Sequence, residues 1–119
     1  MPYVDGFVLA VPKRKVEAYR RISRAAGKVW RDHGALEYRE CVGDDLNIKM
    51  GVTFPRLARA KPGETVVFSW IVWPDKGTRD EGHKKMMSDE RMKDWGKDMP
   101  FDGKRMIFGG FVPIFDMKA

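Results

Sequence analysis

The stretch Thr65-Val66-Val67-Phe68-Ser69-Trp70-Ile71-Val72-Trp73 decides the fold of this chain. After Thr65, every residue except Ser69 is β-branched or aromatic, a composition that predicts a β-strand. Side chains alternate between the two faces of a sheet, so this strand presents apolar groups on both faces. Both faces of the sheet are therefore expected to be buried.

Two strands and a helix are predicted ahead of this apolar strand. Residues Tyr3 to Val11 alternate as a strand does, and Pro12 ends that strand. From Lys13 to His33, apolar residues recur every three or four positions, which predicts one long amphipathic helix that Gly34 terminates. Residues Ala35 to Val42 return to an alternating pattern and predict a second strand.

The segment Leu46 to Glu64 is the least regular part of the chain. It contains one expected helical turn around Arg56 to Ala60 and the turn signal Lys61-Pro62-Gly63. A long irregular excursion in a compact domain often carries function or packs on a partner. We expect one of these roles for it.

A second helix is predicted after the apolar strand. Thr78 and Glu81 have capping-box spacing at its start, and the helix continues through Met87. Ser88 is expected to cap a short continuation toward Trp95.

Residues Lys104 to Phe115 predict a fourth strand, interrupted at Gly109-Gly110 by a bulge or a close backbone approach. The full order is then strand, helix, strand, strand, helix, strand. This order predicts an α+β fold of the ferredoxin-like kind, β-α-β-β-α-β, in which a four-stranded antiparallel sheet carries two helices on one face. Residues 1–119 are expected to form it as a single domain.

The second face of this sheet is left bare, since two helices on one side cannot cover both. An apolar face needs a cover from outside the fold. A second copy of the sheet provides one, because a two-fold homodimer buries the same surface twice. We therefore expect a homodimer that pairs through the sheet face.

Composition and cysteine usage bear on where the protein resides. Of the 119 residues, 43% are hydrophobic and 34% are charged. No apolar run reaches the length of about 18 residues that predicts a membrane span, and no signal peptide is recognisable. Cys41 is the only cysteine, and a lone thiol suits a reducing compartment. The sequence thus predicts a cytoplasmic protein without a membrane partner.

The net charge of +6 makes nucleic acid or another polyanion a candidate partner. Acidic residues interrupt nearly every basic stretch, however, which favours an ordinary solvated surface. Gly110-Phe111-Val112 resembles part of an RNA-recognition motif, but Ile107 and Phe108 occupy the positions of its basic residue and first glycine. Specific nucleic-acid binding is therefore not expected, and a basic module for RNA or another polyanion is the alternative function.

Metal and nucleophile chemistry find little support in the sequence. The two histidines, His33 and His83, are far apart and form no spaced ligand set with the single cysteine, so no metal or cofactor is predicted. We expect His33 at a helix end and His83 at the surface. Cys41 is expected to be a small buried side chain, since no recognised catalytic motif contains it. The catalytic residues, if any, are unknown.

Four blocks of sequence resemble one known family over essentially the whole chain. They are Tyr3-Val4-Asp5-Gly6-Phe7-Val8, His33-Gly34-Ala35-Leu36-Glu37-Tyr38, Phe68-Ser69-Trp70-Ile71 and Met99-Pro100-Phe101-Asp102-Gly103-Lys104-Arg105-Met106-Ile107. Together they resemble the DUF1428 (YbaA-like) family of small bacterial proteins. The resemblance implies a dimeric α/β barrel, in which two ferredoxin-like sheets close face to face. It implies no activity, because the family has no established catalytic residues.

A few polar residues stand among the apolar strands and are the candidates for a ligand pocket. With Trp70 as a flat wall, they are Asp5, Tyr38, Glu40, Ser69 and Arg105. A buried charge is costly unless it is paired, so Asp5 or Glu40 is expected to meet Arg105, either as a structural ion pair or within the pocket. The leading hypothesis is a homodimer that binds or transforms a small molecule inside the barrel, and the sequence leaves open whether it is an enzyme.

Overall fold

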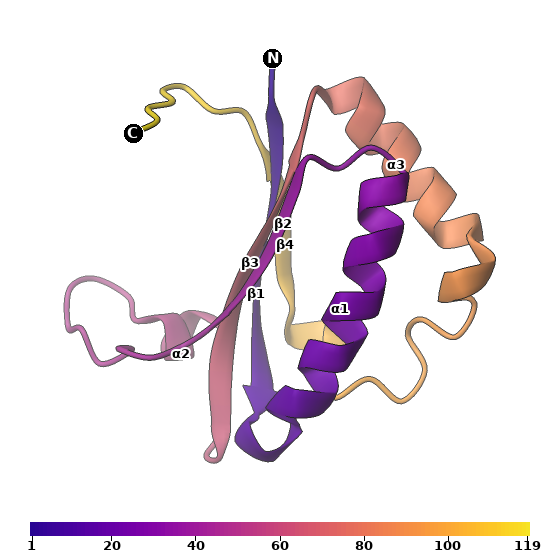
Figure 1. Cartoon of the computed structure of the whole chain (residues 1–119). Coiled ribbons are helices and arrows are strands. Elements are labelled where there is room, and N and C mark those ends of the chain that lie inside the picture. The colour runs from indigo at the N-terminus through magenta and orange to yellow at the C-terminus, as the bar shows by residue number, and fades with distance from the viewer.

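The computed structural model describes the whole chain, from Met1 to Ala119, as one antiparallel sheet with helices against it (Figure 1). The strand order is β2-β3-β1-β4. The elements are β1 (Tyr3–Pro12), α1 (Val16–Asp32), β2 (Glu37–Val42), α2 (Phe54–Leu57), β3 (Glu64–Trp73), α3 (Lys76–Ser88) and β4 (Ile107–Phe111). Short 3-10 turns span Lys13–Lys15, Glu90–Met92 and Gly103–Arg105. The predicted α+β, ferredoxin-like fold is confirmed.

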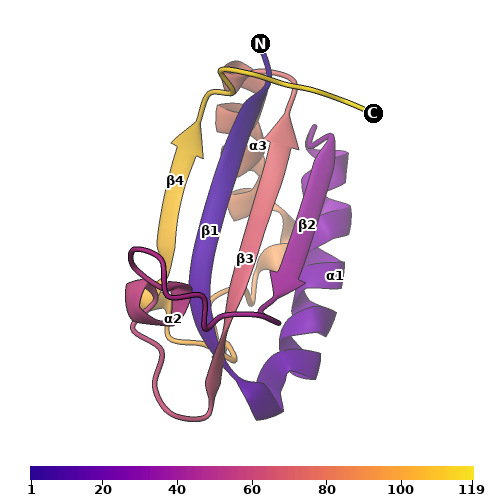
Figure 2. The same cartoon turned by 90° about the vertical axis from the view of Figure 1, so that its left-hand side faces the viewer.

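Helices α1 and α3 cover one face of the sheet, and α2 with its loops lies on the other, which we call the open face (Figures 1 and 2). The strand register assigns side chains to these faces. Ser69 of β3 lies between Phe7 of β1 and Glu40 of β2, so all three side chains share the helix-covered face. Trp70, one position further along, belongs to the open face.

The core lies between the sheet and the two long helices. The largest fully buried side chains of the sheet include Leu9, Ile71 and Trp73. Against them, α1 and α3 bury Tyr19, Ser23, Ala26, Val29 and Met86. The first helix is therefore amphipathic as predicted, and it ends as predicted, with His33 at its C-cap and Gly34 at a φ of 109°.

Helix α3 starts earlier than the sequence predicted. Asp75 is its N-cap, and the Asp75 carboxylate accepts a hydrogen bond from the Thr78 backbone nitrogen at 2.7 Å. The capping box expected at Thr78 and Glu81 was therefore wrong, because a carboxylate three residues upstream already satisfies this amide. Gly82 lies where a Cβ would come within 2.5 Å of the Trp73 ring, so its missing side chain lets α3 approach the sheet closely.

The chain after α3 also differs from the prediction. Asp89, not Ser88, caps the turn Glu90–Met92, because the Asp89 carboxylate accepts a hydrogen bond from the Arg91 amide at 2.9 Å. The Ser88 hydroxyl instead donates to carbonyl oxygens of its own helix. Residues 93–102 then form neither helix nor strand.

Strand β4 is shorter than the predicted strand from Lys104 to Phe115. Asp102 accepts a hydrogen bond from the Lys104 amide at 3.0 Å and closes a 3-10 turn there, so the strand begins only beyond that turn. No bulge interrupts Gly109-Gly110, since the register with β1 is continuous. The close approach there is that of the Tyr3 ring, which packs on the second glycine.

The excursion between β2 and β3 covers only part of the open face (Figure 2). Ala58 packs on Val8, Ala10 and Val66, and Val66 is left only 2% exposed. Farther along β3, Phe68 is 44% exposed. Burial of the second face is therefore complete near the start of β3 and incomplete beyond it.

Candidate functional site

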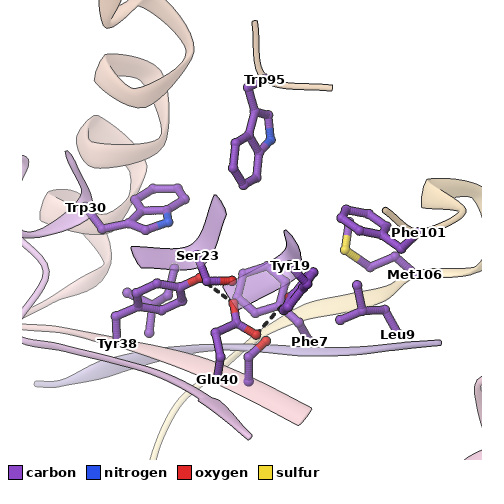
Figure 3. Close-up of a pocket in the computed structure, with 12 residues that line it drawn as sticks. Phe7, Leu9, Tyr19, Ser23, Trp30, Tyr38, Glu40, Trp95, Phe101 and Met106 are labelled. Carbon is purple, nitrogen blue, oxygen red and sulfur yellow. Dashed lines mark hydrogen bonds between the residues drawn. The ribbon is translucent and has the colours of Figure 1, made fainter. Parts of the chain in front are cut away.

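A cavity of about 160 Å³ lies on the helix-covered face, between the sheet, α1 and the chain that follows α3 (Figure 3). The sheet contributes Phe7, Leu9, Tyr38, Glu40, Ser69 and Ile71 to its lining. Helix α1 contributes Tyr19, Ser23 and Trp30, and the later chain contributes Trp95, Phe101 and Met106. The cavity is mostly apolar and aromatic, with a few polar groups concentrated at one side.

Glu40 is the only charged residue in this lining. The alternation of β2 turns Tyr38 and Glu40 toward the helices, where α1 brings Tyr19 to the same point. Glu40 Oε1 accepts a hydrogen bond from the Tyr19 hydroxyl at 2.8 Å, and Glu40 Oε2 accepts one from the Tyr38 hydroxyl (Figure 3). Each carboxylate oxygen thus has one phenol donor.

The electrostatics of this group are set by burial. Burial raises the pKa of Glu40, and this effect exceeds the opposing effect of the hydrogen bonds from Tyr38 and Tyr19. Burial and the adjacent carboxylate also raise the pKa of each tyrosine, which keeps both hydroxyls protonated as donors. No lysine, arginine or histidine lines the cavity. Neutral donors alone therefore hold the carboxylate.

This situation differs from that of other shielded carboxylates in the chain. Three of them form ion pairs with arginine: Asp5 with Arg79, Glu64 with Arg105, and Asp89 with Arg91. Glu40 has only phenol partners. No cation forms an ion pair with Glu40, so its carboxylate relies on neutral hydrogen-bond donors alone.

Ser69 is the second polar feature of the cavity. It is 1% exposed and lies opposite Glu40 on the neighbouring strand. The nearby Ser69 hydroxyl has a small lowering effect on the pKa of Glu40. The geometry is nevertheless too poor for a hydrogen bond, and Ser69 Oγ has no other partner. It is the one buried side-chain polar atom of the chain in this condition. Its hydroxyl therefore keeps unused hydrogen-bonding capacity at the wall of the cavity.

The side of the cavity opposite Glu40 is formed by the chain after α3 (Figure 3). Phe101 packs edge-on against Tyr19, with 5.8 Å between the ring centres, and Trp95 comes from the irregular stretch just before it. Sequence reasoning had not assigned these residues, or Trp30, to a site. The only signal that could have found Trp95 and Phe101 is the presence of large aromatic side chains in a segment without periodicity.

Three of the six residues nominated from the sequence, Tyr38, Glu40 and Ser69, are thus brought together. Asp5 also faces the helices but belongs to a separate cluster. Its Oδ1 accepts a hydrogen bond from Arg79 Nε at 2.9 Å, and its Oδ2 lies 2.8 Å from His83 Nε2.

Asp5 is stabilised in its charged form by this cluster. Burial alone would raise the pKa of Asp5, but hydrogen bonds from His83 and Trp73 and the charge of Arg79 together lower it. The expectation that His83 is a surface residue was wrong, because its side chain is only 29% exposed and packs against this buried carboxylate.

Arg105 and Trp70 lie away from the cavity. Arg105 does not meet Asp5 or Glu40 as expected, because its two Nη atoms bind the two carboxylate oxygens of Glu64 at 2.8 and 2.9 Å. Trp70 is on the open face, because its neighbour Ser69 occupies the helix side of the strand. There its indole nitrogen donates to Glu37 at 2.5 Å.

Three further observations limit the chemistry of the chain. No group of three or more histidine, cysteine, aspartate or glutamate side chains is placed to hold a metal ion. Cys41 is free and half-buried rather than fully buried. No helix combines the length and the apolar character that crossing a bilayer requires.

The architecture and the cavity define a class: a ferredoxin-like α+β protein with an aromatic-lined cavity beneath its helices. The chain belongs to the DUF1428 family, "Protein of unknown function (DUF1428)", whose family model matches residues 2–103. Its relatives include the uncharacterized protein YbaA of Escherichia coli K12 and that of Shigella flexneri. Each is 49% identical over 116 residues, covering 98% of this chain and 99% of the relative. The resemblance found in the sequence is confirmed.

Two solved structures share the fold. A dimeric ferredoxin-like protein from an uncultured marine organism matches with a TM-score of 0.60 at 9% identity, covering 98% of this chain and 100% of that one. The de novo designed protein Foldit4 matches with a TM-score of 0.51 at 17% identity, covering 95% and 99%. At these identities the likeness concerns the fold alone.

Proposed function

We propose that this protein is a homodimer that binds a small, mostly apolar molecule with at least one hydrogen-bond donor, in the cavity beside Glu40. The observation that carries the proposal is the Glu40 carboxylate, which lies among aromatic side chains with two phenol donors and no cation. Burying a carboxylate is costly, and an apolar side chain would serve a purely structural core as well or better. A carboxylate with a perturbed pKa in a cavity is a typical mark of a functional site.

The size of the cavity limits the ligand. Its volume of about 160 Å³ is close to that of an engineered apolar cavity of about 150 Å³ that binds benzene. A single six-membered ring with a short polar substituent is therefore the size of molecule we expect. Phe7, Trp30 and Trp95 offer flat apolar surfaces to such a ring, and Glu40 and Ser69 would receive its substituent.

A cavity-filling variant tests the proposal, with benzyl alcohol and benzylamine as probes. Binding is followed by ligand-observed NMR and by the intrinsic tryptophan fluorescence of the chain, to which Trp30 and Trp95 of the cavity lining contribute. We expect saturable binding of at least one probe to the wild-type chain. Ser69→Met places a larger apolar side chain at the cavity wall and should weaken binding by about tenfold or more, a loss of about 1.4 kcal/mol.

Glu37→Gln provides the matched control, because Glu37 lies on the same strand as Glu40 but faces the other side of the sheet. This variant should bind the probes as the wild type does. If Ser69→Met and the wild type bound the probes equally well, the probes would occupy another site. If neither benzyl alcohol nor benzylamine bound to the wild-type chain, the proposal would be contradicted outright.

The open face supports the homodimer. Phe68 and Phe111 are 44% and 60% exposed there, and Trp70 is half-buried. Exposed apolar side chains that gather on one face of a sheet are typical of an interaction surface. A solved protein of the same fold is described as dimeric, which favours a second copy of the chain as the partner.

One observation favours the alternative function, a basic module for RNA or another polyanion. Arg24, Lys28 and Arg31 occur at helical spacing on α1 and line a hollow of about 300 Å³ beside the start of β2. Glu37 lines the same hollow, and Tyr38 is its only aromatic residue, so it offers little surface for stacking bases. We therefore place this function second.

The cytoplasm is the location that we propose for the protein. Its support is the single thiol of Cys41, which has no disulfide partner and is half-buried. Free thiols of this kind persist in reducing compartments.

A further inference from the structure

We propose that the ligand is an organic cation, namely a primary ammonium group carried on a single ring. This inference rests on the proposed function and narrows it to one ligand class. It follows from the lining of the cavity, which combines the Glu40 carboxylate, an unpartnered hydroxyl and several aromatic rings and contains no cation of the protein.

Charge balance is the first argument. The fold neutralises the shielded carboxylates of Asp5 and Glu64 with arginine, but it gives Glu40 only uncharged phenol partners. An ammonium group supplies the missing positive charge, and charge-assisted hydrogen bonds are the stronger kind, above all where water is excluded. An anionic ligand would meet the same carboxylate with no cation to offset the repulsion.

Hydrogen-bond capacity is the second argument. A primary ammonium has three N–H donors and no acceptor, so it needs a site rich in acceptors. Glu40 retains acceptor sites beyond the two that Tyr19 and Tyr38 use, because a carboxylate offers about four lone-pair positions. Ser69 Oγ is a further acceptor without a partner. A neutral alcohol would use fewer of these acceptors and would leave the charge of Glu40 uncompensated.

The aromatic lining is the third argument. Figure 3 shows Trp30, Tyr38 and Trp95 around the same space, with Glu40 at one side of it. A cation within about 6 Å of an aromatic face is attracted by the ring quadrupole, and tryptophan gives the strongest attraction. An apolar ring of the ligand packs on the same surfaces, so one lining serves both parts of the molecule.

One cation of the protein lies on the outer side of Glu40. Arg20 of α1 lines a smaller neighbouring hollow to which Glu40 also contributes. Its side chain is 57% exposed and its guanidinium group pairs with Glu17 at 3.2 Å, so solvent and another carboxylate already compensate its charge. The titratable and charged groups that line these two hollows with Glu40 are thus Tyr19 and Arg20 of α1 and Tyr38 and Cys41 of β2.

The experiment compares three probes of similar shape and different charge: benzylamine, benzyl alcohol and benzoate. Calorimetric titration of the full chain at neutral pH should show benzylamine binding about tenfold or more tightly than benzyl alcohol. Benzoate should show no saturable binding. Glu40→Gln should weaken benzylamine by about tenfold or more and change benzyl alcohol by less than about threefold. Glu81→Gln removes an exposed carboxylate of α3 and should preserve the wild-type preference.

A pH series on the wild-type chain gives a second measurement that needs no variant. Because burial raises the pKa of Glu40, moderate acid should protonate it and weaken benzylamine while leaving benzyl alcohol nearly unchanged. The ammonium inference would be overturned if the chain bound benzyl alcohol and benzylamine equally well. It would also be overturned if neither Glu40→Gln nor acid altered a preference for benzylamine. Both results would leave the proposed function standing. If neither benzylamine nor benzyl alcohol bound, the ammonium inference and the proposed function would both be overturned.

Discussion

The Trp73 indole donates a hydrogen bond to Asp5 at 2.9 Å, across neighbouring strands of the sheet. Arg79 and His83 of α3 bind the same carboxylate, which has no exposed surface. Asp5 therefore joins α3 to β1 and β3. Its partners are all supplied by the protein, so its role is structural, in contrast with that of Glu40.

Replacing Asp5 by alanine should lower the free energy of unfolding by about 3 to 5 kcal/mol, because the Arg79 charge would remain shielded without its partner. Urea denaturation at neutral pH measures this loss. Since folding lowers the pKa of Asp5, its contribution is present above the usual carboxyl range and disappears as the pH falls through the lowered value.

Asp80→Ala is the matched control for this prediction. Asp80 also pairs with Arg79 but is 42% exposed, so its loss should cost less than about 1 kcal/mol. If the two variants were equally destabilised, the buried cluster would not be the connection that joins α3 to the sheet.

In contrast to Asp5→Ala, Glu40→Gln should stabilise the protein at neutral pH, by on the order of 1 kcal/mol. Folding raises the pKa of Glu40, so the ionised group opposes folding above that raised value. The stability gap between variant and wild type should close as the pH falls through the raised pKa toward 4.5, the ordinary value of the carboxyl group. Thermal unfolding over a pH series checks this, and a variant less stable than wild type would show that Glu40 is a structural group.

Gly82→Ala should destabilise the protein by about 1 to 3 kcal/mol, because the added methyl group would overlap the Trp73 ring. The new Cβ would lie 2.5 Å from that ring and 3.1 Å from the His33 carbonyl oxygen. Gly77→Ala, on the same helix, meets only an Asp75 oxygen at 3.5 Å and should be neutral or stabilising. Denaturation midpoints that are the same for both variants would contradict the close packing of α3 on β3.

The homodimer should appear in sedimentation at micromolar concentration as a species of about twice 13.7 kDa. Trp70→Asp should abolish the dimer, because it replaces a large aromatic side chain of the open face by a charged one that sheet-on-sheet pairing would have to desolvate. The excursion that carries Ala58 already covers Val66 but leaves Phe68 exposed, so the uncovered part of the face is the part that must be paired. A native-like dimer of Trp70→Asp, or a wild-type monomer, would exclude this interface.

Local pattern was sufficient to predict the element order and the sheet. Alternation in β1 and β2, the β-branched and aromatic run of β3 and the helical spacing of α1 are properties of neighbouring residues, and the fold follows from them through general connection rules. The caps were harder to predict, since Asp75 and Thr78 are both good capping residues and only the three-dimensional turn decides between them.

The candidate site was predictable only in part, for a similar reason. Tyr38, Glu40 and Ser69 stood out as polar residues in apolar strands, but the sequence could not show that Trp70 points the other way until the register was known. Trp95 belongs to a segment without periodicity, so no pattern of neighbouring residues placed it over the cavity.

The basic hollow on α1 should bind RNA only weakly and without sequence preference. Its cations, Arg24, Lys28 and Arg31, would displace counterions from phosphates, so any binding should fall steeply as salt rises. Arg24→Gln combined with Arg31→Gln should reduce binding at low salt and flatten its salt dependence, whereas Lys85→Gln on α3 should change it less. Filter binding at about 150 mM salt, near the physiological ionic strength, tests this prediction. Submicromolar affinity that discriminates among RNA sequences would require base contacts. Such a result would make the polyanion module the leading function.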